Sequence, residues 1–254
     1  CSSDLVYALA FDAGLGHPET LIEDRPVRFG TYAPQNFDRQ FHGTLRLREA
    51  LQLSLNIPVV ELLDALGPER LLTALDQSTV RYRLPAGKPG LAIGLGGIGV
   101  TLQDMVGLYA TIANGGVSRP LRWQDCAETG TERRVISAAS AWQVTDILTG
   151  LAPPPGAPAN RLAYKTGTSY GHRDAWAIGF DGRHVIGIWL GRPDGTPVPG
   201  AFGADLAAPV LFQAFARLKP ELTPQPPPPP ETLLVANAQL PPPLQRFRSR
   251  QAAF

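Results

Sequence analysis

The sequence predicts an α/β fold of the α+β type, with a mostly helical first half and a small antiparallel sheet in the second half. Up to about residue 150, apolar residues recur at helical spacing. Three later stretches are short and apolar, as strands are. Asp181-Gly182, between the last two of them, is a typical hairpin turn. With 254 residues, the chain can bury a sizeable core.

The helices are predicted as follows. Residues 5–13 look like the end of a buried helix, which Gly14 terminates, and residues 20–43 look like an extended segment or a long ordered loop. Thr44 is a plausible N-cap for the next helix, and Pro58 is expected to split it in two. The predicted helices from there to the sheet are residues 45–55, 59–66, 68–75, 100–114 and about 137–150, with an irregular glycine-rich stretch at 85–97.

The strands are predicted at residues 162–168, 175–181 and 184–191, and a helix at 204–218 follows them. Residues 220–230 are dominated by proline, which favours extended conformations and adds little to a core, so they read as a linker. The sequence therefore predicts one domain over residues 1–219, a linker at 220–230 and a truncated C-terminal segment at 231–254.

Composition excludes several functions. A formal net charge of +1 leaves no case for a dedicated binder of nucleic acid or of anionic membranes. No stretch approaches the length of a membrane-spanning helix, and the cysteine and histidine spacings resemble no zinc site. No signal peptide opens the chain, and because it begins at Cys1 we expect it to be clipped.

Three motifs could carry chemistry. Residues 94–99 match the dinucleotide fingerprint G-x-G-x-x-G, but they lack its preceding strand and its later acidic residue, so we interpret them as a structural turn. Lys165-Thr166-Gly167-Thr168 ends a predicted strand, with Lys165 and Gly167 on one face and the threonines on the other. Ser54-Leu55-Asn56 alone reads as an ordinary helix end, whose side chains bond the local backbone.

Taken together, the last two motifs point to acyl transfer, because a serine–lysine site is built from S-x-x-K, S-x-N and K-T-G, and the second and third occur here in that order. Here the chain resembles the transpeptidase domain of penicillin-binding proteins, and in detail the class A, bifunctional 1C type. The resemblance covers residues 5–218 and includes the stretches 32–38, 45–58, 101–116, 173–176 and 189–192.

The resemblance implies a fold like that of the serine β-lactamases, with a helical subdomain and a five-stranded antiparallel sheet. Its first two strands precede the Ser-x-x-Lys motif, so we expect only the last three here. The motif's lysine position falls on about Ser3, and its nucleophilic serine would lie upstream of Cys1. We therefore expect a transpeptidase domain at residues 1–219 that lacks its nucleophile and is inactive alone.

The resemblance also implies residue roles. Ser54 would shuttle a proton, Asn56 would hold the substrate backbone and Lys165 would supply positive potential. The hydroxyl groups of Thr166 and Thr168 would bind the terminal carboxylate beside Gly167, and the Thr168 N–H would form half of the oxyanion hole.

The implied partners are peptidoglycan stem peptides, β-lactams as inhibitors of the intact parent, and cell-wall synthesis proteins. No cofactor or metal is implied, and the implied location is the periplasm or the outer face of the bacterial cytoplasmic membrane. Two alternatives stay open: a noncatalytic relative that binds stem peptides or has a regulatory role, and a β-lactamase-like serine hydrolase.

Overall fold

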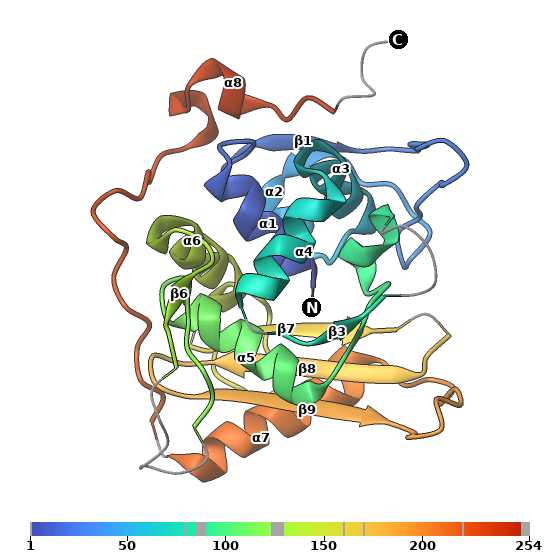
Figure 1. Ribbon diagram of the computed structural model, residues 1–254, viewed down its shortest axis with the longest axis vertical. Helices are drawn as coiled ribbons and strands as arrows, with labels where there is room; N and C mark the ends of the chain where they lie inside the picture. The colour runs from blue at the N-terminus through green and yellow to red at the C-terminus, as the bar shows by residue number, and fades with distance from the viewer. Residues whose placement is uncertain are drawn as a thin grey trace.

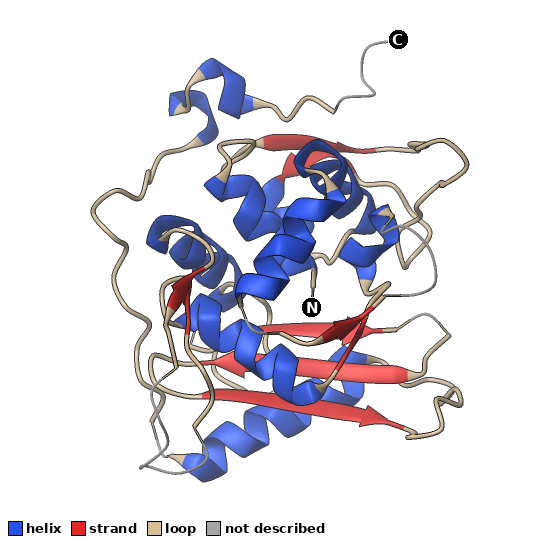
Figure 2. Ribbon diagram, viewed as in Figure 1, coloured by secondary structure: helices blue, strands red, loops and turns tan. Residues whose placement is uncertain are grey.

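The structure is a computed structural model that describes residues 2–78, 80–84, 90–122, 130–159, 161–169, 171–219 and 221–249. A three-stranded antiparallel sheet lies at one end of the molecule, and most of the helices form a layer at the other end (Figures 1 and 2). The predicted combination of a helical part and a small antiparallel sheet is therefore confirmed.

The sheet contains β7 (Ala163–Thr168), β8 (Asp174–Phe180) and β9 (Val185–Gly191) in the order β7-β8-β9, each within one or two residues of its predicted range. In register, Lys165 pairs with Ile178 and Trp176 pairs with Trp189. Among the described residues β9 has no further strand beside it, as expected if only the last three strands of the family sheet are present.

The two faces of this sheet serve different cores because side chains alternate along a strand. Ala163, Ile178 and Phe180 belong to the main core beneath the helical layer, which includes α5 and α6. Tyr164 and Ala177 face the other way, into a second core that α7 covers. Lys165 therefore shares the Ala163 face and points toward the helical layer.

The helical layer surrounds α1 (Ser3–Asp12), which is buried on all sides from Asp4 to Phe11. Its other α-helices are α2 (Leu47–Gln52), α3 (Asn56–Leu66), α4 (Pro68–Gln77), α5 (Leu102–Ala113) and α6 (Ala138–Thr149). Thr101 and Ser137 cap α5 and α6 by accepting hydrogen bonds from Asp104 N and Ser140 N. The helix after the sheet begins as a π turn, η2 (Gly203–Ala207), before α7 (Ala208–Leu218).

Short strand pairs connect these helices. β1 (Leu21–Asp24) pairs with β2 (Gly43–Arg46), β3 (Tyr82–Arg83) with β4 (Gly99–Val100), and β5 (Val117–Ser118) with β6 (Arg133–Arg134), all antiparallel. The predicted extended segment at residues 20–43 thus contains β1, and the loop from residue 25 to 42 joins it to β2.

Two predictions between residues 44 and 58 are wrong. Thr44 is no N-cap, because it lies in β2 and pairs with Glu23 on β1. The helix begins only at Leu47. At its start the Glu49 carboxylate accepts a hydrogen bond from Arg46 N. Pro58 does not split a helix either. It lies in the first turn of α3, where a missing N–H costs little, and the break falls at Ser54.

The glycine-rich stretch is a structural turn, as predicted. A short 3₁₀ helix, η1 (Leu91–Leu95), packs on α1 and α3, and a Cβ on Gly94 would lie 3.0 Å from Leu63 Cδ2. The first part of the predicted glycine-rich stretch, residues 85–89, lies outside the described residues.

The segment after α7, which we call the strap (residues 221–249), runs along one side of the molecule from the sheet to β1 (Figure 1). Near its start, Asp181 accepts hydrogen bonds from Lys219 Nζ (2.6 Å) and Thr223 N (2.8 Å). At its far end, after η3 (Asn237–Gln239) and α8 (Pro242–Gln245), Phe247 N donates to Leu21 O on β1. The strap is therefore attached to the domain near both of its ends.

Within the described part of the chain, we find no helix that is long and apolar enough to cross a membrane.

Candidate functional site

The structure brings together Ser54 and Lys165, two predicted site residues that are 111 positions apart in the sequence. Ser54 follows α2 at the edge of the helical layer, and Lys165 lies on β7. Lys165 Nζ donates a hydrogen bond to Ser54 Oγ and a second one, 3.0 Å long, to Thr166 O. The Ser-x-Asn and Lys-Thr-Gly motifs thus meet where the helical layer contacts the sheet.

Lys165 is deeply buried, with 2% of its surface exposed, whereas Ser54 is open to solvent. Burial lowers the pKa of Lys165 below its ordinary value, and the charge of Asp4 at the start of α1 acts in the opposite direction. Burial therefore makes the charged form of this amine costly, and the acceptors Ser54 Oγ and Thr166 O and the Asp4 charge oppose that cost. When charged, the amine raises the positive potential at the Ser54 hydroxyl.

Ser54 has a positive φ of 57°, in the left-handed region that few residues other than glycine adopt. This conformation lets the chain reverse between α2 and α3 and points the serine toward β7. The neighbouring loop supports the reversal: Asn36 Oδ1 accepts hydrogen bonds from Asn56 N (2.9 Å) and Ile57 N (3.4 Å).

Asn56 lies at the first turn of α3, but among the described residues its side chain forms no hydrogen bond with Ser54 or Lys165. Asn56 Nδ2 donates to Gln35 O at 2.7 Å, in the loop between β1 and β2. This leaves the Asn56 Oδ1 atom available as an acceptor.

The Thr166-Gly167-Thr168 stretch forms the end of β7, the outer strand of the sheet on this side. Ser169 N donates to Asp174 O on β8. Because successive N–H groups along a strand point to opposite sides, the Thr168 N–H points away from β8 and out of the sheet. Thr168 Oγ1 accepts a hydrogen bond from Gly203 N at 3.1 Å, which leaves the hydroxyl proton free to donate elsewhere. Among the described residues Thr166 Oγ1 has no hydrogen-bond partner.

Three aromatic rings next to this strand were not predicted as site residues. Phe37, His172 and Phe202 contact one another edge to face, with ring centroids 4.9 to 5.9 Å apart. They connect the β1–β2 loop with the β7–β8 turn and with the chain before η2. Only Phe37 lies in a stretch that the sequence pointed to, and spacing alone gave no signal that the three rings would meet.

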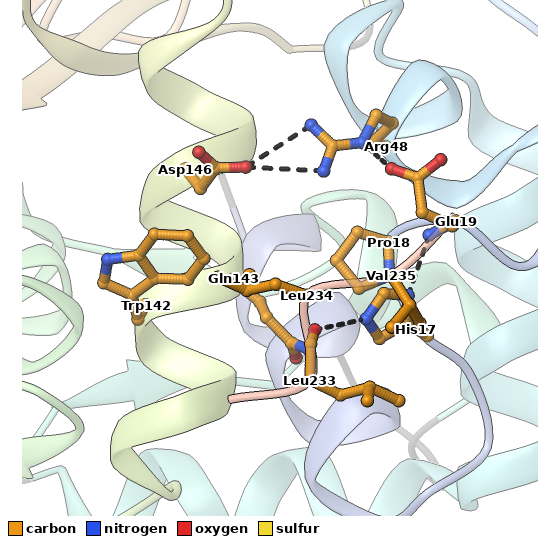
Figure 3. A pocket seen from close by; sticks show the side chains of 10 residues that line it. All are labelled: His17, Pro18, Glu19, Arg48, Trp142, Gln143, Asp146, Leu233, Leu234 and Val235. Atoms are coloured by element: carbon orange, nitrogen blue, oxygen red, sulfur yellow. Dashed lines mark hydrogen bonds and ion pairs between the residues drawn. The ribbon is translucent and has the colours of Figure 1, made fainter. Parts of the chain in front are cut away.

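A cavity of about 190 Å³ lies elsewhere, and it shares no lining residue with the Ser54–Lys165 site. It opens between the strap and α6 (Figure 3), where Arg48 bridges Glu19 (2.5 Å) and Asp146 (3.3 Å), and His17 bonds Leu233 O. In the described ranges, His, Cys, Asp and Glu form no group of three that could hold a metal ion.

A buried lysine bonded to a serine, beside an outer strand whose backbone N–H points outward, is typical of proteins with the serine–lysine acyl-transfer architecture. A family model described as the penicillin binding protein transpeptidase domain matches residues 5–183, and the chain belongs to this family. The family predicted from the two motifs is therefore confirmed.

Curated relatives agree with this assignment. The chain is 47% identical over 213 residues to penicillin-binding protein 1C of Escherichia coli strain K12, a match that covers 82% of the chain and 28% of that protein. It is 30% identical to penicillin-binding protein 1B of Vibrio cholerae, over 79% of the chain and 29% of that protein. The expected likeness to the 1C type is confirmed, and the chain spans less than a third of these relatives' length.

Solved structures support the fold. The penicillin-binding protein PonA1 of Mycobacterium tuberculosis in complex with penicillin V matches with a TM-score of 0.75 and 23% identity, covering 95% of this chain and 74% of that one. Penicillin-binding protein 1A of Haemophilus influenzae matches with a TM-score of 0.71 and 19% identity, over 89% and 43% of the two chains.

Proposed function

We propose that this chain supplies the proton-transfer and substrate-binding part of a D,D-transpeptidase that cross-links peptidoglycan. The observation that carries the proposal is the hydrogen bond between Lys165 on β7 and Ser54, which is exposed to solvent. In this proposal residues 1–219 form the transpeptidase unit, residues 220–230 connect it to a short C-terminal segment at 231–254, and the reaction takes place outside the cytoplasmic membrane.

The reaction is two successive acyl transfers. A serine hydroxyl of a Ser-x-x-Lys motif attacks the carbonyl carbon of the bond between two D-alanines, and the C–N bond breaks to release D-alanine. An amine of a second stem peptide then attacks the ester, so that an amide bond forms and the serine hydroxyl is restored. A β-lactam would be attacked in the same way and would remain as the ester.

In this scheme Ser54 delivers the proton to the leaving amine. Because Lys165 Nζ donates to Ser54 Oγ, the serine's own proton is free to point toward a substrate nitrogen. In this proposal a positive charge on Lys165 makes that proton easier to give up. Ser54 then takes up the proton that the attacking serine has lost, so neither Ser54 nor Lys165 changes its protonation state over the whole step. Asn56 Oδ1 accepts from a substrate backbone N–H.

The end of β7 binds the rest of the substrate. The Thr168 N–H is directed outward and would donate to the developing oxyanion, and the hydroxyl groups of Thr166 and Thr168 would donate to the terminal carboxylate. Gly167 lacks a side chain and therefore lets the ligand approach the strand. These roles are supported by the outward direction of the Thr168 N–H and by the unused hydroxyl protons.

Residues 1–254 contain no serine that is followed three positions later by lysine. We infer that this polypeptide alone binds an acyl-D-alanyl-D-alanine peptide without being acylated. The same observation favours a second candidate, a noncatalytic relative that binds stem peptides.

The test is a nuclear magnetic resonance titration of the chain with diacetyl-L-lysyl-D-alanyl-D-alanine. We expect shifts of the Thr166, Gly167 and Thr168 amide signals, smaller shifts with the matching L-alanyl-L-alanine peptide, and no covalent product by mass spectrometry. A peptide that perturbs only the strap, or nothing, would count against the proposed site.

A further inference from the structure

We propose that Asp24 and Asn36 are positioning residues of the transpeptidase site, which hold the turn at Ser54 in the conformation that reaches Lys165. The effect of these residues on catalysis rests on the proposed function, whereas their effect on the conformation of the Ser54 turn does not. Neither residue belongs to the Ser-x-Asn or Lys-Thr-Gly motifs, and each is separated from Ser54 by at least one other side chain or by backbone.

Asn36 uses both ends of its side chain, and it is 3% exposed. Its Nδ2 donates to both Asp24 carboxylate oxygens, at 2.9 and 2.8 Å, and to Gln40 O at 2.8 Å. Its Oδ1 accepts from the backbone of Asn56 and Ile57. The amide therefore connects the β1 carboxylate to the first turn of α3.

The first turn of α3 needs such a partner. The first N–H groups of a helix have no acceptor within the helix, and a side chain at the N-cap usually supplies one. Here the N-cap is Leu55, whose side chain cannot accept a hydrogen bond. Asn36 provides the missing acceptor from 20 residues earlier, and so it fixes the start of α3 directly after the strained Ser54.

Asp24 decides which way the Asn36 amide faces. The carboxylate is completely buried and accepts from Asn36 Nδ2 and from His42 N (2.7 Å) and His42 Nδ1 (3.0 Å). Since a carboxylate only accepts, an amide turned the other way would place two acceptors against each other. Asp24 therefore forces Oδ1 toward Asn56.

Other titratable groups surround this carboxylate. His42 also contacts Asp38 at 3.4 Å. The Asp24 charge contributes to the raised pKa of Glu61 on α3 and of the Tyr7 hydroxyl on α1. A second acid placed at position 36 would thus enter an acidic cluster. Burial and the neighbouring Asp24 charge would raise the pKa at which the pair loses its shared proton, so the pair would hold one proton below that pKa and none above it.

The test uses three variants of the 254-residue chain: Asn36→Ala, Asn36→Asp and, as a control, Asn114→Ala. The control removes an asparagine that bonds Val117 O at the end of α5, away from the site. We measure hydrogen-exchange protection of the Asn56 and Ile57 amides. In Asn36→Ala we expect at least about a tenfold loss of protection there relative to α5, because a capping acceptor is lost, and no such loss in the control.

Asn36→Asp gives a readout that a general packing role would not produce. We expect the protection of Asn56 to fall as the pH rises through the raised pKa of the acid pair and to recover when the pH is lowered again, after correction for the intrinsic exchange rate, because one shared proton restores the hydrogen bond to Asp24. This variant also keeps the proposal testable if Asn36→Ala does not fold. Equal protection in all variants, or no recovery on acidification, would overturn the inference.

The effect on catalysis is measured as the rate of acylation of the polypeptide that the gene encodes from its own start codon. We expect Asn36→Ala to slow acylation by a fluorescent penicillin at least about tenfold, and Asn114→Ala to leave it unchanged. If exchange responds as expected but the unmodified polypeptide is never acylated, the proposed function fails while the positioning of the turn stands. An acylation rate that Asn36→Ala leaves unchanged would overturn the positioning role.

Discussion

Replacing Ser54 by alanine should make Lys165 a weaker base. In the structure Lys165 Nζ has two hydrogen-bond acceptors, Ser54 Oγ and Thr166 O, and 2% of the residue is exposed. A hydrogen bond to a charged group contributes about 1.5–3 kcal/mol. Because the ammonium form uses the Ser54 oxygen, its loss should reduce the proton affinity of the amine by about tenfold to a hundredfold.

The assay is a pH titration of the lysine side-chain signals by nuclear magnetic resonance. The chain has only three lysines, Lys88, Lys165 and Lys219, so their signals can be assigned by substitution. Ser118→Ala serves as the control, since it removes a buried serine hydroxyl that bonds Ser78 O instead. We expect the Lys165 midpoint to be below the usual range in the unmodified chain and lower still in Ser54→Ala.

The sign for stability also follows. A lysine whose folded-state pKa is lowered binds fewer protons in the folded than in the unfolded chain, so this group's contribution to stability increases as the pH rises toward 10.5. A Lys165 midpoint at the ordinary value, or equal midpoints in Ser54→Ala and Ser118→Ala, would refute the reasoning.

Three further predictions concern stability and the sheet. Burial raises the pKa of Glu61 to about 7, so stability should fall by up to about 3 kcal/mol as the pH rises from 4.5 through 7, and Glu61→Gln should flatten that slope in urea denaturation. Asp181→Asn should lower the free energy of unfolding by about 3 kcal/mol and speed proteolysis of the strap, because the buried partner of Lys219 is lost; the exposed Asp194→Asn should do neither. In a dilute monomer, alternate β9 amides should exchange rapidly because no strand within the described ranges pairs with its outer edge; slow exchange throughout would contradict this.

Local sequence patterns predicted the sheet well. The three strands were short apolar runs separated by turn residues, and the alternation of side chains placed Lys165 on the face opposite the threonines, as the structure has it. The helix break was misplaced because proline is a strong local signal, whereas the left-handed conformation of Ser54 has no signature in the sequence.

Long-range contacts could not be predicted from the pattern. Asp24 and Asn36 look like loop residues, and their role depends on β1 and α3 lying side by side, which only the folded chain shows. The same holds for the strap: a run of prolines indicates an extended chain, but its attachment to Asp181 and to β1 depends on tertiary structure.

We propose that Ser54 and Lys165 act together with the serine of a Ser-x-x-Lys motif, a motif that residues 1–254 do not contain. This proposal is tested most directly by intact-mass spectrometry of the polypeptide that the gene encodes, after incubation with penicillin. We expect one covalent adduct, on the serine of a Ser-x-x-Lys motif shortly before Leu5-Val6-Tyr7. A polypeptide without that motif and without an adduct would contradict the proposed transpeptidase function and favour a noncatalytic relative.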